Sequence, residues 1–164
     1  MNRKTPVVFA LVVTVMVVMA DSPTAVLTLS GTVSRVVAIT VTPQNNHNSL
    51  DLANGENDKV VGLVNEWSND KAGYTIILTS AGAGSTSQPA LKPSNAGNSD
   101  SVPYSLKYKG VPVQLNQGSA ILSSGSGRTS SGGSNNFLTV TIPRPSAVAA
   151  DSYSDTLTFT IQGN

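Results

Sequence analysis

The chain has 164 residues, of which ten are Lys or Arg and nine are Asp or Glu, so its formal net charge is +1. It contains no cysteine, which excludes a disulfide framework and a cysteine-ligated metal site. So few basic residues do not form a field that attracts nucleic acid or anionic lipid. Ser, Thr, Asn, Gly and Val are abundant, and this composition favours β-strands.

The N-terminus has the pattern of a secretory signal peptide. A basic start at residues 2–4 precedes an almost wholly apolar run at residues 6–19, and residues 18–20 are small or apolar before Asp21. The apolar run is shorter than the roughly 20 residues that span a bilayer, which disfavours a transmembrane anchor. We expect residues 1–20 to be removed, which takes away two of the ten basic residues and leaves eight against nine acidic ones.

The stretch from Ala25 to Val41 alternates with a period of two, the side-chain repeat of an extended strand. A single strand of this length would span about 56 Å at roughly 3.3 Å per residue, whereas strands in compact domains usually have about 3–10 residues. Arg35 interrupts the apolar face. We therefore expect two strands in series, 25–33 and 35–42, and the first can reach beyond its own domain.

Further alternating segments, separated by polar turns, indicate a series of strands. They cover residues 60–67, 74–80, 102–109, 113–115, 120–122, 137–142 and 153–162. Two segments rich in small and polar residues, 81–101 and 123–136, are predicted to be surface loops. About seven strands at this spacing in one domain predict an all-β protein with a β-sandwich architecture.

Residues that could serve catalysis or metal binding are interpreted as turn residues. His47 is the only histidine and lies in a polar turn. Asp51, Glu56 and Asp58 cluster around the Asn54-Gly55 turn, but their spacing does not match a calcium-binding loop. No Ser lies in the setting of a nucleophile. We predict no catalytic residue, no metal site, no cofactor and no small-molecule substrate, and hence no enzyme.

Four aromatic residues leave an alternative open. Trp67, Tyr74, Tyr104 and Tyr108 could form a platform for sugar, although their strand spacing fits a core or a groove better. In that alternative the protein is a self-complete secreted β-sandwich that binds glycan or another surface ligand. Residues 25–33 would then be the first strand of its own sheet.

Two segments resemble those of a known family. Residues 149–161, AADSYSDTLTFTI, look like the closing strand of chaperone-usher pilus subunits, in which Tyr, a polar residue and Asp-Thr precede alternating apolar positions. Residues 69–80, NDKAGYTIILTS, are similar to a middle strand of that family, where a Gly-Tyr pair precedes alternation. The alternating stretch after the signal peptide resembles the pilin N-terminal extension. The chain thus resembles a fimbrial subunit of the archaic, spore-coat-U-like or a related type.

The resemblance implies an incomplete immunoglobulin-like β-sandwich at residues 35–164, preceded by an N-terminal extension at residues 21–34. Such a sandwich lacks its final strand, and the extension of another subunit supplies it as a donor strand. The side chains of the donor strand would be those of Ala25, Leu27, Leu29, Gly31 and Val33. The acceptor groove would be lined in part by Leu157, Phe159 and Ile161.

The resemblance also implies a function. The protein would be a structural subunit of a surface fimbria, polymerise by donor-strand exchange, and support adhesion or biofilm formation. Its partners would be like subunits of the same fibre, a periplasmic chaperone and an outer-membrane usher, with a tip adhesin as a further candidate. We accordingly expect export through the periplasm to the cell surface.

Overall fold

The computed structural model describes residues 24–145 and 147–164, and within them the chain is all β, without a helix. Its strands are β1 (Val37–Pro43), β2 (Glu56–Ser68), β3 (Tyr74–Ser80), β4 (Ala90–Pro93), β5 (Val102–Pro103), β6 (Ser105–Tyr108), β7 (Val111–Pro112), β8 (Ser119–Gly125), β9 (Ser134–Ile142), β10 (Tyr153–Ser154) and β11 (Leu157–Gly163). No helix long and apolar enough to cross a membrane occurs in these residues. The predicted signal peptide, residues 1–20, lies outside the described residues.

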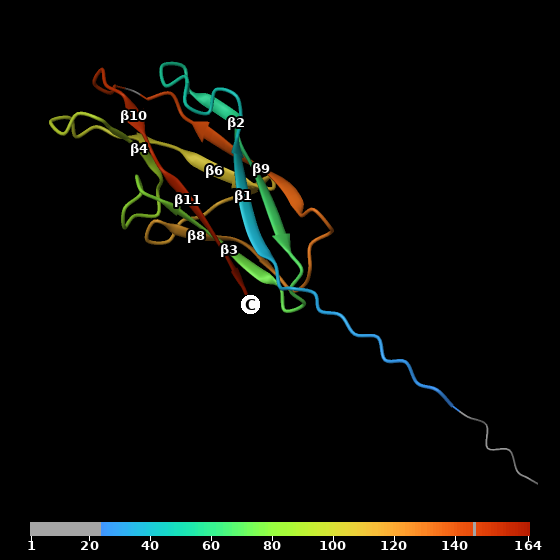
Figure 1. Ribbon diagram of the computed structural model, residues 1–164. Helices are drawn as coiled ribbons and strands as arrows, with labels where there is room; N and C mark the ends of the chain where they lie inside the picture. The colour runs from blue at the N-terminus through green and yellow to red at the C-terminus, as the bar shows by residue number, and fades with distance from the viewer. Residues whose placement is uncertain (1–23, 146) are drawn as a thin grey trace, which may run out of the picture. The chain divides into compact units, whose positions relative to one another are not determined.

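The strands pair antiparallel in three hydrogen-bonded sheets (Figure 1). The largest has the order β1-β2-β9-β6-β7, and the others have the orders β10-β4-β5 and β11-β3-β8. Only Asp155 and Thr156 separate β10 from β11, so the chain passes there from one small sheet to the other. The all-β class is confirmed, and the several antiparallel sheets are consistent with a β-sandwich.

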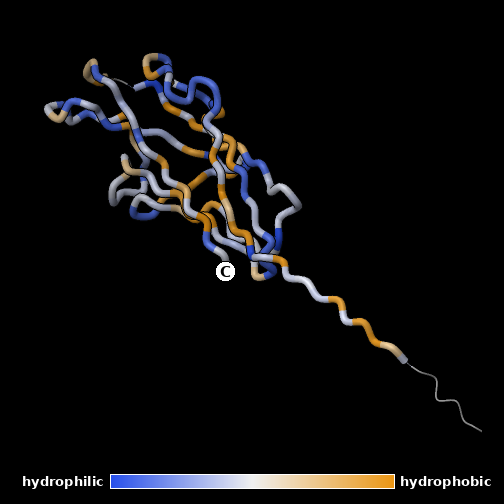
Figure 2. The backbone as a smooth tube through the Cα atoms, viewed as in Figure 1, coloured by the Kyte–Doolittle hydropathy of each residue, from blue (hydrophilic) through white to orange (hydrophobic). Residues whose placement is uncertain are grey.

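Alternation along the strands produces the hydrophobic core. The alternating residues on one face of β3 and of β9 are all buried: Tyr74, Ile76, Leu78, Leu138, Val140 and Ile142. Side chains from β2, β3, β4, β5, β6 and β9 meet in one cluster, so the core is shared by the sheets. Figure 2 shows hydrophobic residues spaced along these strands. Each fully buried aliphatic side chain stabilises the fold by about 1.5–3 kcal/mol.

Three predictions about loops and short strands were wrong. The segment 81–101 contains β4, in which Ala90 and Leu91 are buried, because it pairs with β5 and β10. The predicted loop at 123–136 is shortened from both ends, since β8 runs to Gly125 and β9 begins at Ser134. The predicted strand at 113–115 is replaced by β7, which ends at Pro112.

The chain divides into two compact units, residues 1–33 and residues 34–164. The second unit contains all the strands described above. In the first unit, the described residues 24–33 form no strand, so the strand predicted at 25–33 is absent from the single chain. The strand predicted at 35–42 is present as β1 and begins at Val37.

Candidate functional site

Two edge strands lie side by side in the second unit. Among the described residues, β1 is at the edge of the five-stranded sheet and pairs only with β2, and β11 is at the edge of its sheet and pairs only with β3. β1 and β11 approach each other (Figure 1), but no hydrogen-bonded pairing joins them in the described residues. Unpaired strand edges can accept another strand.

The backbone of β1 directs part of its hydrogen-bonding groups away from β2. Asn69 N donates to Val36 O at 3.1 Å, and Gln44 N donates to Val61 O at 3.0 Å, so the even-numbered residues of this segment face β2. Successive residues of a strand direct their backbone groups to opposite sides. The groups that face the open side therefore belong to Val37, Ile39 and Val41.

β11 has the same arrangement. Ala81 N donates to Thr156 O at 3.0 Å, and Asn164 N donates to Gly73 O at 3.2 Å, so even-numbered residues face β3. The backbone groups that face the open side belong to Leu157, Phe159 and Ile161. Two rows of backbone groups, which have no strand partner within residues 24–145 and 147–164, therefore face the gap between β1 and β11.

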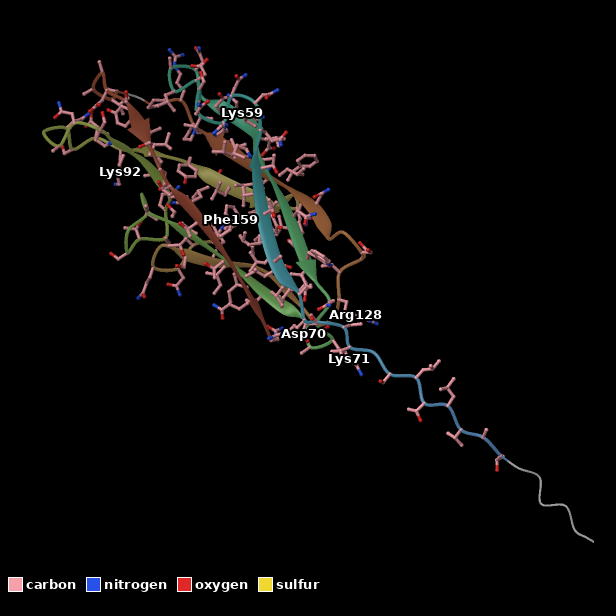
Figure 3. The ribbon with its side chains drawn as sticks, viewed as in Figure 1. Lys59, Asp70, Lys71, Lys92, Arg128 and Phe159 are labelled. Carbon is pink, nitrogen blue, oxygen red and sulfur yellow. The ribbon has the colours of Figure 1, made fainter. Side chains whose placement is uncertain are left out.

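An apolar groove of about 570 Å³ lies between these strands. Its walls come from β1, β2, β4, β6, β9, β10, β11 and the turn after β1. Its apolar lining includes Val41, Leu50, Leu52, Val61, Leu91, Leu106, Leu138, Val140, Leu157 and Phe159. Figure 3 labels Phe159 on β11. A concave, mainly apolar surface next to strand edges suits an amphipathic β-strand better than a polar metabolite.

The structure places the three predicted acceptor residues on one face of β11. Leu157, Phe159 and Ile161 are each half-buried, and the residues between them are exposed. Leu157 and Phe159 line the groove, whereas Ile161 does not. Two of the three predicted acceptor residues therefore contribute to the groove itself.

The groove is closed at one end. A Cβ atom added at Gly163, at the end of β11, would collide with the guanidinium of Arg35 and approach Val37 at 3.2 Å. At the other end, Pro43 and Leu157 both line the groove. β1 and β11 therefore run antiparallel, and the gap widens from the Arg35 end toward Pro43.

The five predicted donor residues are all exposed in the first unit. The side chains of Leu27, Leu29 and Val33 have exposed fractions of 83%, 86% and 87%. Three large apolar side chains of alternating spacing, each more than four-fifths exposed, are a surface that water disfavours. They form an unsatisfied apolar face in the described residues 24–33.

Asp155 anchors the wide end of the groove. It accepts hydrogen bonds from the Tyr104 hydroxyl at 2.5 Å, the Ser80 hydroxyl at 2.6 Å and Gly82 N at 2.6 Å. Burial, reinforced by the Asp155 carboxylate, raises the pKa of Tyr104. These bonds hold the chain where β10 ends and β11 begins.

A second polar cluster centres on Glu66, whose side chain is fully buried. Its carboxylate accepts hydrogen bonds from the hydroxyls of Tyr74, at 2.7 Å, and Tyr108, and it pairs with Lys109 at 3.0 Å. Burial and the Glu66 carboxylate raise the pKa of Tyr74 to about 12 and also raise that of Tyr108. The sequence analysis missed this cluster. The available signal was that Glu66 lies two residues after Val64 in the same strand, so both side chains point to the buried face.

The other predicted polar positions remain dispersed. His47 is an exposed turn residue whose Nδ1 lies 2.9 Å from Gln44 O. Glu56 pairs with Lys59 at 2.5 Å and Asp58 with Lys107 at 2.8 Å. The described residues contain no group of three or more His, Cys, Asp or Glu that could hold a metal ion.

The aromatic residues do not form a common platform. Tyr74, Tyr104 and Tyr108 are buried, with 7%, 3% and 2% of their surface exposed, while Trp67 is 39% exposed. The three tyrosine hydroxyls donate hydrogen bonds to the carboxylates of Asp155 and Glu66. A sugar ring could therefore reach only Trp67 among these four.

Neither the scan against protein-family models nor the search of curated proteins found a match to the sequence. Two features of the structure bear on function. One is the apolar groove between the edge strands β1 and β11, and the other is the exposed alternating segment at residues 25–33.

Proposed function

We propose that the protein is a structural subunit of a surface fimbria that polymerises by donor-strand exchange. In this proposal, residues 25–33 of one copy enter the groove of the next copy as a β-strand. The observation that carries the proposal is the groove between β1 and β11, which faces two rows of backbone groups without a strand partner. A strand placed there would pair on both sides, a form of β-augmentation.

The donor segment, residues 25–33, has the chemistry that the groove needs. Apart from Val26, its apolar residues lie at every second position, so one face can meet Leu157 and Phe159 while the other faces solvent. Burying Leu27, Leu29 and Val33 would stabilise the joint by about 5–9 kcal/mol before entropic costs. Gly31 allows the backbones to approach closely, since it carries no side chain.

The proposal also includes the topology of the sandwich. We infer that residues 35–164 form an incomplete immunoglobulin-like sandwich, and that the donor strand supplies the missing strand between β1 and β11. The predicted division at residues 34 and 35 lies next to the boundary between the two compact units. In the assembled fibre, each sandwich would be completed by its neighbour.

The proposed partners follow from the open groove. An unpaired edge beside apolar surface promotes aggregation, so a subunit in transit needs its groove covered. A periplasmic chaperone that lends a strand would supply that cover, and an outer-membrane usher would exchange it for the next subunit. The proposal places the final assembly at the cell surface, where it would support adhesion or biofilm formation.

Deletion of residues 21–33 tests the proposal. The truncated chain keeps the groove but has no donor, so we expect folded protein in the periplasm and no fibres by electron microscopy when it is expressed with its secretion partners. A synthetic peptide of residues 21–34 should bind to the truncated chain. Normal fibres from the truncated chain, or no binding of the peptide, would refute donor-strand exchange.

A further inference from the structure

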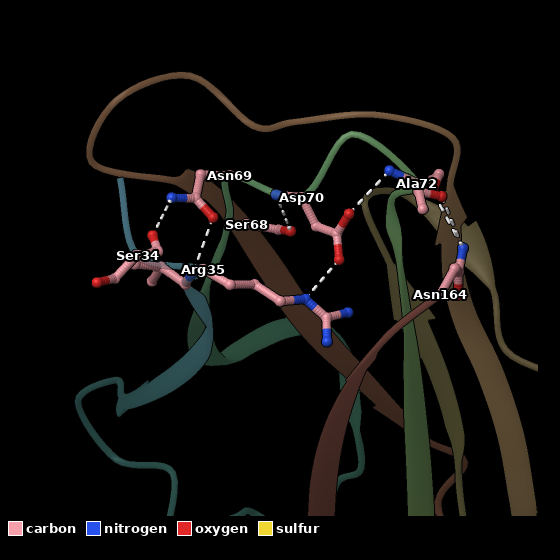
Figure 4. Close-up of polar contacts among 9 residues, drawn as sticks. Ser34, Arg35, Ser68, Asn69, Asp70, Ala72 and Asn164 are labelled. Carbon is pink, nitrogen blue, oxygen red and sulfur yellow. Dashed lines mark hydrogen bonds and ion pairs between the residues drawn. The ribbon is translucent and has the colours of Figure 1, made fainter. Parts of the chain in front are cut away.

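Asn69 holds the start of β1 in an extended conformation. Its side-chain Oδ1 accepts a hydrogen bond from Val36 N at 2.7 Å, and its Nδ2 donates to Ser34 O at 2.8 Å (Figure 4). Its backbone N donates to Val36 O at 3.1 Å. Asn69 follows directly after β2, so these bonds continue the β1–β2 ladder beyond both strands. Residues 34–36 are therefore fixed as a continuation of β1.

An ion pair adds a second tie at the same place. Arg35 Nε donates to Asp70 Oδ2 at 2.5 Å, and Asp70 Oδ1 accepts a hydrogen bond from Ala72 N at 2.9 Å (Figure 4). An exposed pair of this kind contributes only about 0–1 kcal/mol to stability. Its consequence is geometric, because it directs the Arg35 guanidinium toward Gly163 at the closed end of the groove.

Two routes could bring the donor segment into a groove. It could enter the groove of a second copy, or it could fold back and enter the groove of its own chain. The second route requires an antiparallel hairpin between the donor segment and β1. Directly opposite residues of such a hairpin point to the same face, so odd-numbered donor residues must oppose odd-numbered residues of β1.

The register of that hairpin places its turn at the residues held by Asn69. A three-residue loop at 34–36 would set Val33 opposite Val37 and Leu29 opposite Val41, which lines the groove. A loop at 33–35 would set Leu27 opposite Val41 and would also take Ser34 and Arg35 into the turn, whereas a loop at 31–33 would leave Leu27 opposite Val37, short of the groove. A self-inserted strand that sets Leu27 or Leu29 opposite Val41 therefore needs Ser34 and Arg35 to leave the extended conformation.

We propose that Asn69, with the Arg35–Asp70 pair, prevents the chain from filling its own groove and so reserves the donor segment for a second copy. Forming the turn would break the Asn69 bonds to Ser34 and Val36, and neither Ser34 nor Arg35 has the preference for positive φ that short hairpin loops favour. These residues act as positioning residues. The inference rests on the proposed donor-strand function.

A disulfide trap tests this inference, because the chain has no cysteine of its own. Leu29→Cys and Val41→Cys together should form an intramolecular disulfide only when the donor segment folds back on β1. In the otherwise unchanged mature chain, we expect intramolecularly bridged monomer to be a minor species on non-reducing gels. Adding Asn69→Ala should raise its fraction about tenfold, the effect of losing one or two hydrogen bonds.

Two further variants control the experiment. Asn65→Ala removes an amide of β2 that bonds to Gly132 O at 3.2 Å and Asn135 Oδ1 at 2.8 Å, away from residues 34–36, and should leave the bridged fraction unchanged. Asn69→Asp keeps the acceptor for Val36 N but loses the donor to Ser34 O, so it should give an intermediate fraction. It also serves if Asn69→Ala does not fold.

The outcomes separate this inference from the proposed function. Abundant bridged monomer in the unchanged background, or no increase with either Asn69 variant, would overturn the inference. Fibre formation by the cysteine-free wild-type chain is scored in parallel. Fibres without an increase in bridging would refute the role of Asn69 alone, whereas the absence of fibres would count against donor-strand exchange.

Discussion

The Tyr104 hydroxyl donates a hydrogen bond to Asp155 at 2.5 Å, which joins the residue before β6 to the break between β10 and β11. The same carboxylate accepts from Ser80 and from Gly82 N. One side chain therefore fixes three segments around the wide end of the groove. The shape of the groove depends on this contact as well as on its apolar lining.

Replacing Asp155 tests this role. Asp155→Ala leaves the largely buried Tyr104 and Ser80 hydroxyls without their acceptor, so we expect the free energy of unfolding to fall by about 2–3 kcal/mol. Denaturant unfolding of the mature chain measures the change. Asp58→Asn is the matched control, because it removes the exposed ion pair with Lys107 but keeps a side chain that tolerates the positive φ of residue 58, and it should change stability by less than about 1 kcal/mol. Equal effects of the two substitutions would contradict the role of Asp155.

Glu66 should matter more for stability than any exposed charge. Glu66→Ala removes the acceptor of two buried tyrosine hydroxyls and the partner of Lys109, and we expect a loss of about 3–5 kcal/mol. Glu66→Gln keeps one carbonyl acceptor and should be less harmful. Unfolding in denaturant distinguishes the two variants, and a neutral effect of Glu66→Ala would show that the buried cluster is dispensable.

Alkaline pH should weaken the same cluster. Burial and the neighbouring carboxylate raise the pKa of Tyr74 to about 12 in the folded chain, above the value of about 10 for an unperturbed tyrosine. The stability linked to this raised pKa is complete below about pH 10 and is lost as the pH rises toward about 12. Phenolate absorbance should therefore rise together with unfolding in this range. Titration of Tyr74 near pH 10 in a chain that stays folded would contradict the prediction.

The donor segment should be sensitive to charge on one face only. Leu29→Asp places a carboxylate where the proposal buries an apolar side chain, and burial of an unpaired charge is strongly unfavourable. We expect fibres to disappear while the unfolding free energy of the single chain stays unchanged, because Leu29 is already 86% exposed. Ser30→Asp is the control on the opposite face and should still give fibres under the electron microscope. Loss of fibres with both variants would indicate general charge sensitivity instead.

The strands with clean alternation could be predicted from sequence, and the strands hidden in low-complexity segments could not. Tyr74–Ser80 was predicted with its bounds because its apolar residues occupy every second position and glycine precedes it. β4 was missed because Ala90 and Leu91 are its only apolar residues, and their burial depends on the pairing with β5 and β10. Tertiary contact, rather than local preference, decides such short strands.

The candidate site likewise contains residues that could be predicted from the sequence and residues that could not. Leu157 and Phe159 could be placed on one face of a strand from their alternation, and the resemblance to pilus subunits implied a groove beside that face. The contacts of Asn69 with residues 34–36 could not, because they depend on the register between β1 and β2 and join residues 33 to 35 positions apart. Glu66 lay within reach of sequence reasoning, since a charged residue at an inward position of a strand needs a buried partner.

Cryo-electron microscopy of the assembled fibre would show where the donor segment lies. We predict density for residues 25–33 of one copy as a strand between β1 and β11 of the next copy, with Leu27 and Leu29 inserted into the groove. We also predict that residues 34–36 remain extended against Asn69. A groove that is empty in the fibre, or filled by the donor segment of its own chain, would refute donor-strand exchange between copies.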